Sequence, residues 1–174
     1  MTFERTVANA LTDATGVRWS RTKPGDVQEL GDIIPQGPLS TAWGQVFVEC
    51  KAHQSVGTRH LLEPNQQLKD WWVRCVVEAL AVSRMPILMV RIKNFGIVMI
   101  TEWETLELLG YSYPSGSWEI CLPQEMWQSD HVVMAVALDT IIEPCQAIET
   151  AAAALSLAPR QTTPHHGDLS VRPA

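Results

Sequence analysis

The sequence predicts an α/β domain, and three observations predict it. The chain has 174 residues, enough for one domain with a sizeable core. Segments whose apolar residues recur at helical spacing alternate with short apolar runs of strand length. Two of these runs, over 85–92 and 95–100, are continuously apolar, as in strands that are covered on both faces. We therefore expect helices packed against a central sheet.

The helices are predicted from apolar spacing and from capping residues. The segment 2–15 has one apolar side, and Thr2 can cap its start. A long helix is expected over 64–83, where apolar residues keep helical spacing behind a Glu-Pro start signal. A short helix is expected over 101–110, with Thr101 as its cap.

The strands are predicted from short apolar runs bounded by turn formers. The segment 17–21 is expected to be extended, 32–35 to form a short strand, and 45–52 to form a longer one. The last two are separated by a connection at 36–44, which predicts a hairpin with a long loop. The continuous runs 85–92 and 95–100 supply two further strands.

Beyond Tyr111 the pattern is less regular. The segment 131–138 fits a strand or a buried helix, and 142–157 fits a helix. Residues 159–174 are polar, contain prolines and lack periodicity, which predicts a disordered tail. We therefore expect one domain over 1–158.

Composition excludes several classes of protein. No run approaches the 18 apolar residues of a membrane helix, and no basic segment precedes an apolar one at the N-terminus, so a cytoplasmic protein without a membrane partner is expected. The four cysteines are widely spaced and form no CxxC pair, which favours reduced thiols. The histidines have no partners at zinc-site spacing, which argues against a zinc or histidine-based site.

Charge is distributed unevenly along the chain. The formal net charge of −6 argues against a nucleic-acid partner. Residues 18–93, however, carry 10 Lys and Arg against 7 Asp and Glu, whereas residues 94–174 carry 2 against 10. The acidic residues are therefore concentrated away from the strand predicted over 45–52, although a chance difference between the halves explains the same numbers.

Charged residues stand at the ends of the two hairpin strands. Asp32 begins the first strand, and Glu49 and Lys51 end the second. Because side chains alternate along a strand, Glu49 and Lys51 are expected on one face and Cys50 on the other. The two carboxylates, with the backbone carbonyl of Cys50, make an all-oxygen set of the kind Mg²⁺ prefers. The alternative is an ordinary surface ion pair between Glu49 and Lys51.

Gly31-Asp32 followed by Glu49-Cys50-Lys51 resembles the signature of the PD-(D/E)XK nuclease superfamily. The resemblance covers about residues 2–100 and implies a restriction-endonuclease-like core, with a central mixed sheet flanked by helices. Gly31 stands where the signature has proline, and Asp26 is a second candidate for the first carboxylate. We favour Asp32 because it directly precedes the apolar pair Ile33-Ile34.

Two further positions agree with the resemblance. Glu4, on the first predicted helix, matches in kind an acidic residue that many resolvase-like members carry there, although an acidic residue also suits the first turn of any helix. Gln67-x-x-x-Trp71 is similar to the QxxxY element of RecB-like nucleases, with tryptophan in place of tyrosine.

The resemblance implies a metal-dependent DNA endonuclease. Asp32 and Glu49, with the carbonyl of Cys50, would hold Mg²⁺, for which Mn²⁺ would substitute, and Lys51 would orient the attacking water; Glu4 and Gln67 would assist. The small resolvases of this superfamily imply branched DNA or Holliday junctions as substrate and a homodimer, from a bacterial cell or a phage-infected host. The alternatives are a RecB-like exonuclease or processing nuclease and a non-catalytic DNA-binding or assembly protein of the same fold.

Contacts with nucleic acid are expected from basic and aromatic side chains. The phosphate-binding candidates are Arg18, Arg21, Lys23, Arg59 and Lys69, for which ordinary solvated charge is the alternative. Trp71 and Trp72 are candidates for stacking on a base, although aromatic residues at helical spacing more often belong to a core.

Overall fold

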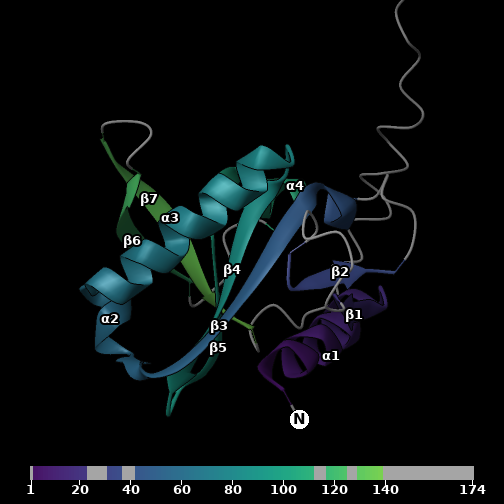
Figure 1. The fold of residues 1–174 in the computed structure, drawn as a ribbon, viewed down its shortest axis with the longest axis horizontal. Helices are drawn as coiled ribbons and strands as arrows, with labels where there is room; N and C mark the ends of the chain where they lie inside the picture. Colours follow the sequence, from purple (N-terminus) through teal and green to yellow (C-terminus); the bar gives the residue numbers. More distant parts are fainter. Residues whose placement is uncertain (1, 23–30, 37–41, 112–116, 125–128, 139–174) are drawn as a thin grey trace, which may run out of the picture.

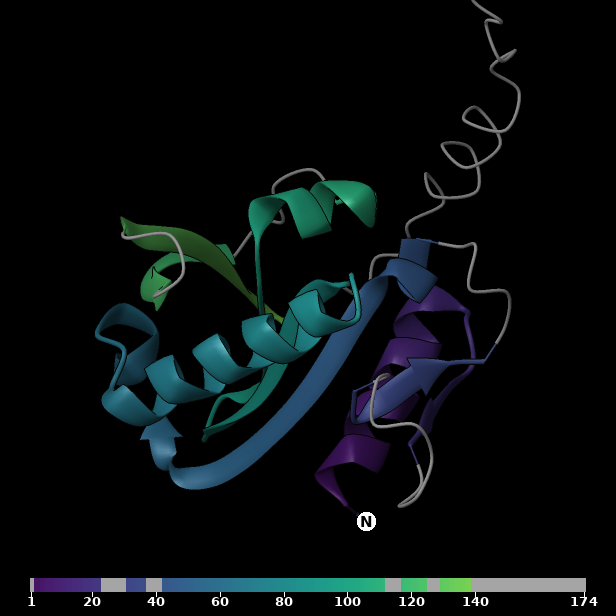
Figure 2. The same ribbon diagram turned by 45° about the horizontal axis from the view of Figure 1, so that its top comes forward.

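A seven-stranded mixed sheet organises the described part of the chain. The computed structural model describes residues 2–22, 31–36, 42–111, 117–124 and 129–138. The strand order is β1-β2-β3-β4-β5-β7-β6, with β3 and β4 parallel and the other neighbours antiparallel. Helices lie on the two sides of this sheet (Figures 1 and 2). The predicted fold class, a restriction-endonuclease-like core with a central mixed sheet flanked by helices, is confirmed.

The strands are β1 (Trp19–Arg21), β2 (Ile33–Pro35), β3 (Val46–Gly57), β4 (Met85–Lys93), β5 (Gly96–Thr101), β6 (Ser117–Gln124) and β7 (Ser129–Ala137). The helices are α1 (Phe3–Thr15), α2 (Arg59–Leu62), α3 (Gln66–Ala81) and α4 (Trp103–Leu108), with a 3₁₀ turn over Ala42–Gln45.

Each face of the sheet has its own apolar core. On the first face α1 and α4 pack on the sheet, and the core includes Phe3, Val7, Leu11, Val48, Cys50, Ile87, Met89 and Leu106. On the second face α3 crosses the sheet, and the core includes Phe47, Leu68, Trp72, Cys75, Leu88, Val90, Ile100 and Val133. Because β4 and β5 contribute side chains to both cores, their apolar runs are continuous, as predicted. We refer to these faces as the α1 face and the α3 face.

The hairpin and both long helices form close to the predicted positions. β2 pairs with β3 in antiparallel fashion, with Ile33 opposite Val48. α3 begins at Gln66 rather than at 64, because the Asn65 side chain accepts a hydrogen bond from the backbone N–H of Leu68 at 2.9 Å. This asparagine cap is a start signal that the prediction from the Glu-Pro pair overlooked.

Several predicted boundaries differ from the structure. β3 continues to Gly57, five residues beyond the predicted end, and parallel pairing with β4 carries it as far as Ala52 before the register shifts. The segment 131–138 lies within β7 as far as Ala137, so the strand alternative holds, and β6 was not predicted. The predicted helix over 142–157 and the predicted tail over 159–174 lie outside the described residues.

The predicted cap at Thr101 is wrong. Thr101 is the last residue of β5, and its buried hydroxyl donates to the carbonyl of Pro86 at 2.6 Å. α4 begins at Trp103, with Glu102 at the N-cap position. The hydroxyl therefore ties two neighbouring strands together instead of capping a helix. Across the described residues, no helix is long and apolar enough to cross a membrane.

Candidate functional site

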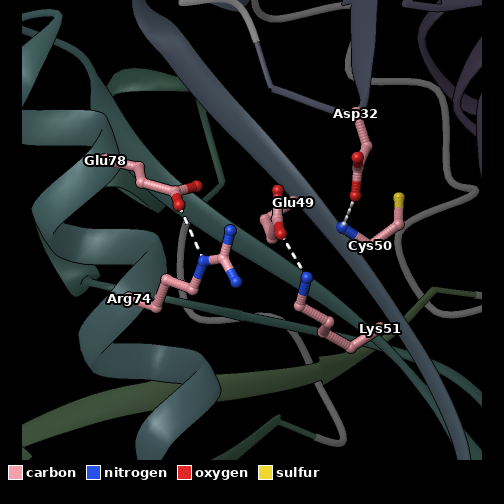
Figure 3. A network of polar contacts seen from close by, with 6 residues as sticks. All are labelled: Asp32, Glu49, Cys50, Lys51, Arg74 and Glu78. Carbon is pink, nitrogen blue, oxygen red and sulfur yellow. Dashed lines mark hydrogen bonds and ion pairs between the residues drawn. The ribbon is translucent and has the colours of Figure 1, made fainter. Parts of the chain in front are cut away.

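Glu49 and Lys51 lie side by side on the α3 face of β3. The strand alternates, so that Val48 and Cys50 enter the core of the α1 face while Phe47 enters that of the α3 face. Glu49 and Lys51 follow Phe47 on the α3 face, and the Lys51 ammonium donates to Oε1 of Glu49 (Figure 3). Glu49 is 6% exposed, whereas the Lys51 side chain is 23% exposed. As predicted, Glu49 and Lys51 lie on one face of the strand and Cys50 on the other.

Asp32 is attached to the same segment of β3 through two hydrogen bonds. Its backbone N–H donates to the carbonyl of Val48 at 2.8 Å, and its Oδ2 accepts from the backbone N–H of Cys50 at 2.8 Å. The second bond is the dashed line between Asp32 and Cys50 in Figure 3. The Asp32 carboxylate thus lies against the Glu49-Cys50-Lys51 segment, although the chain separates them by 17 or more residues. Asp26, the other candidate, lies outside the described residues.

Gly31 allows this close approach. Its φ is +80°, a conformation that L side chains rarely adopt, and a Cβ added to it would lie 2.5 Å from the carbonyl oxygen of Val48. The glycine that departs from the usual proline of the signature is therefore the residue that this backbone requires, since proline is restricted to a φ of about −65°. Thr22 supports the same turn, because its hydroxyl donates to the carbonyl of Gly31 at 2.6 Å.

The predicted strand end at Glu49 and Lys51 lies inside β3 in the structure, and its electrostatics are unusual for the interior of a strand. Burial raises the pKa of Glu49, the hydrogen bond from Lys51 opposes that rise, and the charges of Asp32 and Glu78 add to it; the net effect is a raised pKa. Burial also raises the pKa of the Cys50 thiol well above its ordinary value. The thiol is therefore protonated and acts as a core side chain, which leaves Cys50 only its backbone groups for chemistry.

The donor groups fit a hard divalent cation. Asp32 and Glu49 supply carboxylate oxygens, and Cys50 supplies a carbonyl. In an extended strand the N–H and C=O of one residue point to the same side, so the Cys50 carbonyl faces the side on which Asp32 lies. In the part of the chain that the structure describes, no group of three or more His, Cys, Asp or Glu side chains is close enough to share a metal ion. The protein would thus supply two carboxylates and one carbonyl, and water would complete the coordination.

Glu4 lies on α1 and Gln67 on α3, the helices on the two faces of the sheet. Glu4 lies in the first turn of α1, on the opposite face of the sheet from Glu49. Partial burial tends to raise its pKa, but hydrogen bonds from its own backbone N–H and from Thr2, with the charges of Arg21 and Lys51, outweigh that and lower it. Glu4 is therefore ionised close enough to Lys51 for their charges to interact. Gln67 is the second residue of α3, next to the buried face of that helix.

The two tryptophans of α3 differ in their surroundings. Trp72 is fully buried in the core of the α3 face, which excludes it from stacking on a base in this structure. Trp71 is half-buried and packs against the edge of that core. Of the two stacking candidates, only Trp71 reaches the surface.

The predicted phosphate-binding residues that the structure describes lie on different elements of the fold. Arg18 and Arg21 are exposed at β1, and Arg21 interacts electrostatically with Glu4. Arg59 begins α2, beyond the end of β3, and its Nε donates to the His60 ring at 3.1 Å. Lys69 is two residues from Gln67, about 200° further round α3. Lys23 lies outside the described residues. Their role in binding stays a prediction.

Two residues that sequence reasoning missed face the site from α3. Arg74 and Glu78 form an ion pair, with Nε of Arg74 2.7 Å from Oε1 of Glu78. Figure 3 shows this pair beside Glu49 and Lys51, across the space between α3 and β3. The spacing in the sequence could have indicated them. Arg74 lies seven residues after Gln67 and Glu78 lies eleven after it, so all three are on the same side of the helix.

Comparison with known proteins gives one match. A family model described as "Phage putative PDDEXK endonuclease" matches residues 1–143. No curated protein and no solved structure matches the chain. The matched range contains all strands of the sheet and every residue of the site described above.

Proposed function

The chain belongs to the phage PDDEXK endonuclease family whose model it matches, and from this premise we propose that it is a metal-dependent nuclease that hydrolyses phosphodiester bonds in DNA. One observation carries the proposal. The turn at Gly31 and the hydrogen bond from Cys50 N–H to Asp32 bring the Asp32 carboxylate against the segment that carries Glu49 and Lys51. Two carboxylates, a carbonyl and an ammonium in one place suit the attack of water on a phosphate.

Asp32, Glu49 and the carbonyl of Cys50 are the residues that would hold the metal ions, which we propose to be Mg²⁺, with Mn²⁺ as a substitute. When bound there, a divalent cation polarises the phosphate and lowers the pKa of a bound water. Its charge would also offset the burial and the Asp32 charge that raise the pKa of Glu49.

Lys51 is the proposed residue that orients the attacking water. An ammonium has three N–H donors, and the hydrogen bond to Glu49 uses one of them. The remaining donors can contact the water and a phosphate oxygen, on which negative charge develops. The water oxygen forms the new bond to phosphorus and releases a proton to solvent, one P–O ester bond breaks, and the leaving oxygen takes a proton from solvent. Glu4, whose charge interacts with that of Lys51, would contribute to the charge of the site or bind metal through water.

Branched DNA, such as a Holliday junction, is the substrate that we propose. The support is the position of Glu4 at the start of α1, which resembles that of the acidic residue in resolvase-like members. A homodimer would place two such sites on the two strands of a junction. A RecB-like exonuclease is the second candidate, and Gln67 and Trp71 on the site-facing side of α3 favour it.

A cleavage panel tests the proposal. Linear, single-stranded, flapped, four-way and covalently closed circular DNA, together with RNA, are incubated with Mg²⁺, Mn²⁺ or EDTA. We expect metal-dependent cutting that is strongest on the four-way junction, and a loss of about 100-fold or more in Glu49→Gln and Lys51→Met. Lys93→Ala is the matched control, because Lys93 is exposed and follows Ile92, which packs under α3, so that Lys93 points to the opposite face.

The panel also separates the alternatives. Cutting of circular DNA is incompatible with a strict exonuclease. Degradation of linear DNA alone favours the RecB-like candidate. If folded Glu49→Gln and Lys51→Met proteins cut as fast as the unaltered chain, the assignment of the site is wrong.

A further inference from the structure

One side of α3 borders the site (Figure 3). The buried residues of α3 are Leu68, Trp72, Cys75, Val76 and Ala79. Arg74 and Glu78 lie along one edge of this buried face, four residues apart and one helical turn from each other. This edge faces Glu49, as Figure 3 shows.

The contact with Glu78 uses only one nitrogen of the Arg74 guanidinium. Nε donates to Oε1 of Glu78 at 2.7 Å, and within the described residues no hydrogen bond engages the two terminal nitrogens. In Figure 3 these nitrogens point away from α3, toward the side on which Glu49 and Lys51 lie. The Arg74 side chain is 66% exposed, so a ligand can reach it.

Helix stability does not account for this pair. Exposed ion pairs four residues apart contribute little to helix stability, and the order with the acidic residue first is the more stabilising one. Here Arg74 precedes Glu78. The definite effect of the contact is to hold the guanidinium in one orientation, with its two terminal nitrogens directed at the site.

A site with three carboxylates nearby repels a polyanion. Figure 3 shows Asp32, Glu49 and Glu78 together there, and the Lys51 ammonium is paired with Glu49 alone. A nucleic-acid strand that enters this space therefore needs a further positive group. A planar guanidinium with two parallel N–H groups matches two phosphate oxygens, which a lysine ammonium does not.

We propose that Arg74 binds a phosphate of the nucleic-acid strand on the α3 side of the site, and that Glu78 is a positioning residue that orients the guanidinium. The proposal rests on the proposed nuclease function and names a substrate contact that completes it. Arg74 engages the strand through its terminal nitrogens while Nε stays on Glu78. The strand then runs along the surface at the edge of the contact between α3 and β3, where Lys51 and Arg74 are both accessible.

Binding and kinetics of matched variants test the proposal. Fluorescence anisotropy in EDTA measures the Kd for labelled duplex and four-way DNA without cleavage, and cleavage in Mg²⁺ gives kcat and KM. For Arg74→Ala we expect Kd and KM to rise about 10- to 100-fold, with a smaller change in kcat. The slope of log K against log salt should fall by about 1. Lys93→Ala removes one positive charge from the opposite face and should change none of these values.

The conservative variants separate contact from charge. Arg74→Lys should restore the salt slope but only part of the affinity, because lysine keeps the charge and loses the paired donors. Glu78→Gln keeps a hydrogen-bond acceptor and should raise KM by less than Arg74→Ala. Both Glu78 variants lose the same negative charge, and that loss alone would strengthen DNA binding. Weaker binding by Glu78→Ala than by Glu78→Gln therefore supports a positioning role for Glu78.

Two results overturn the proposal, and they differ. If the unaltered chain binds no nucleic acid, the proposed nuclease function fails together with the role of Arg74. If it binds DNA and Arg74→Ala binds equally well, with an unchanged salt slope, the nuclease function stands and the role of Arg74 is wrong.

Discussion

Substitution of Gly31 tests how the first carboxylate is held. A Cβ at Gly31 would lie 2.5 Å from the carbonyl oxygen of Val48 and 3.0 Å from its nitrogen, and both atoms belong to the backbone of a central strand. Gly16 is the matched control. It also has a positive φ, of +69°, but a Cβ there would meet nothing within 4 Å. The comparison of Gly31→Ala with Gly16→Ala therefore isolates the close approach from the backbone conformation.

The expected magnitude follows from these contacts. Alanine with a positive φ costs about 1–2 kcal/mol at either position. At Gly31 the chain must also move by at least about 0.5 Å to relieve the contact, which weakens the bonds from Asp32 N–H to Val48 and from Cys50 N–H to Asp32. Each such bond contributes about 1 kcal/mol. We expect Gly31→Ala to unfold with a free energy about 2 kcal/mol lower than that of Gly16→Ala.

The assay is urea unfolding followed by far-UV circular dichroism, together with cleavage at a temperature where each variant is folded. Gly31→Ala should also lose about 100-fold in activity, because a shift of about 1 Å at a catalytic group has that effect. Gly31→Pro, which restores the usual residue of the signature, should be worse than Gly31→Ala, since proline cannot adopt a φ of +80°. Equal stabilities of Gly31→Ala and Gly16→Ala, or a fully active Gly31→Pro, would refute this reasoning.

Three further outcomes are expected. In the metal-free protein, carboxyl NMR should show Glu49 titrating above its ordinary pKa of 4.5. Glu78→Gln should lower this pKa and Lys51→Met should raise it. Titration of Glu49 at or below 4.5 would contradict the effect of burial. Because the folded-state pKa is raised, the contribution of Glu49 to stability is present below the unfolded pKa and is lost as pH rises through the folded one. Thr101→Val should cost about 1–3 kcal/mol in urea unfolding, because it leaves a buried carbonyl of β4 without its donor. Thr105→Val should be neutral or stabilising, since the buried Thr105 hydroxyl has no partner in the described part of the chain; equal losses would contradict this contrast. The double variant Glu49→Met with Lys51→Met should lose cleavage but unfold at the same or a higher urea concentration than the unaltered chain. A free energy of unfolding lower by more than about 2 kcal/mol would show instead that the pair stabilises the fold.

The sequence predicted the part of the fold that depends on local pattern. The apolar runs of β4 and β5 and the amphipathic α1 and α3 are visible because strand and helix periods differ. The end of β3 was missed because His53, Gln54 and Ser55 interrupt the apolar run, and pairing with β4 returns only at Gly57, opposite Lys93, after the register shift. Thr101 was misassigned because a threonine before a helix pattern suits a cap and a strand end equally well in sequence, and only the neighbouring carbonyl of Pro86 decides between them.

The candidate site was predictable where a charged residue stands next to an apolar run of strand length. Asp32 was favoured over Asp26 because it precedes two isoleucines, and the structure attaches it to Cys50 by a hydrogen bond. Arg74 and Glu78 were missed for a different reason. An arginine four residues before a glutamate is an ordinary feature of helix surfaces, and only the packing of α3 across β3 brings the pair to Glu49.

The energetics of β3 argue that Glu49 and Lys51 are retained for chemistry. Glu49 is almost fully buried, and its raised pKa means that folding disfavours the charge that the residue must carry to bind a cation. A buried ion pair often stabilises a fold no more than apolar residues of similar volume would. Phe47, two residues earlier on the same face, shows that this strand accepts such a residue under α3. A sheet selected for stability alone would continue that apolar row, so the charged pair indicates a ligand whose own charge compensates for the burial of Glu49.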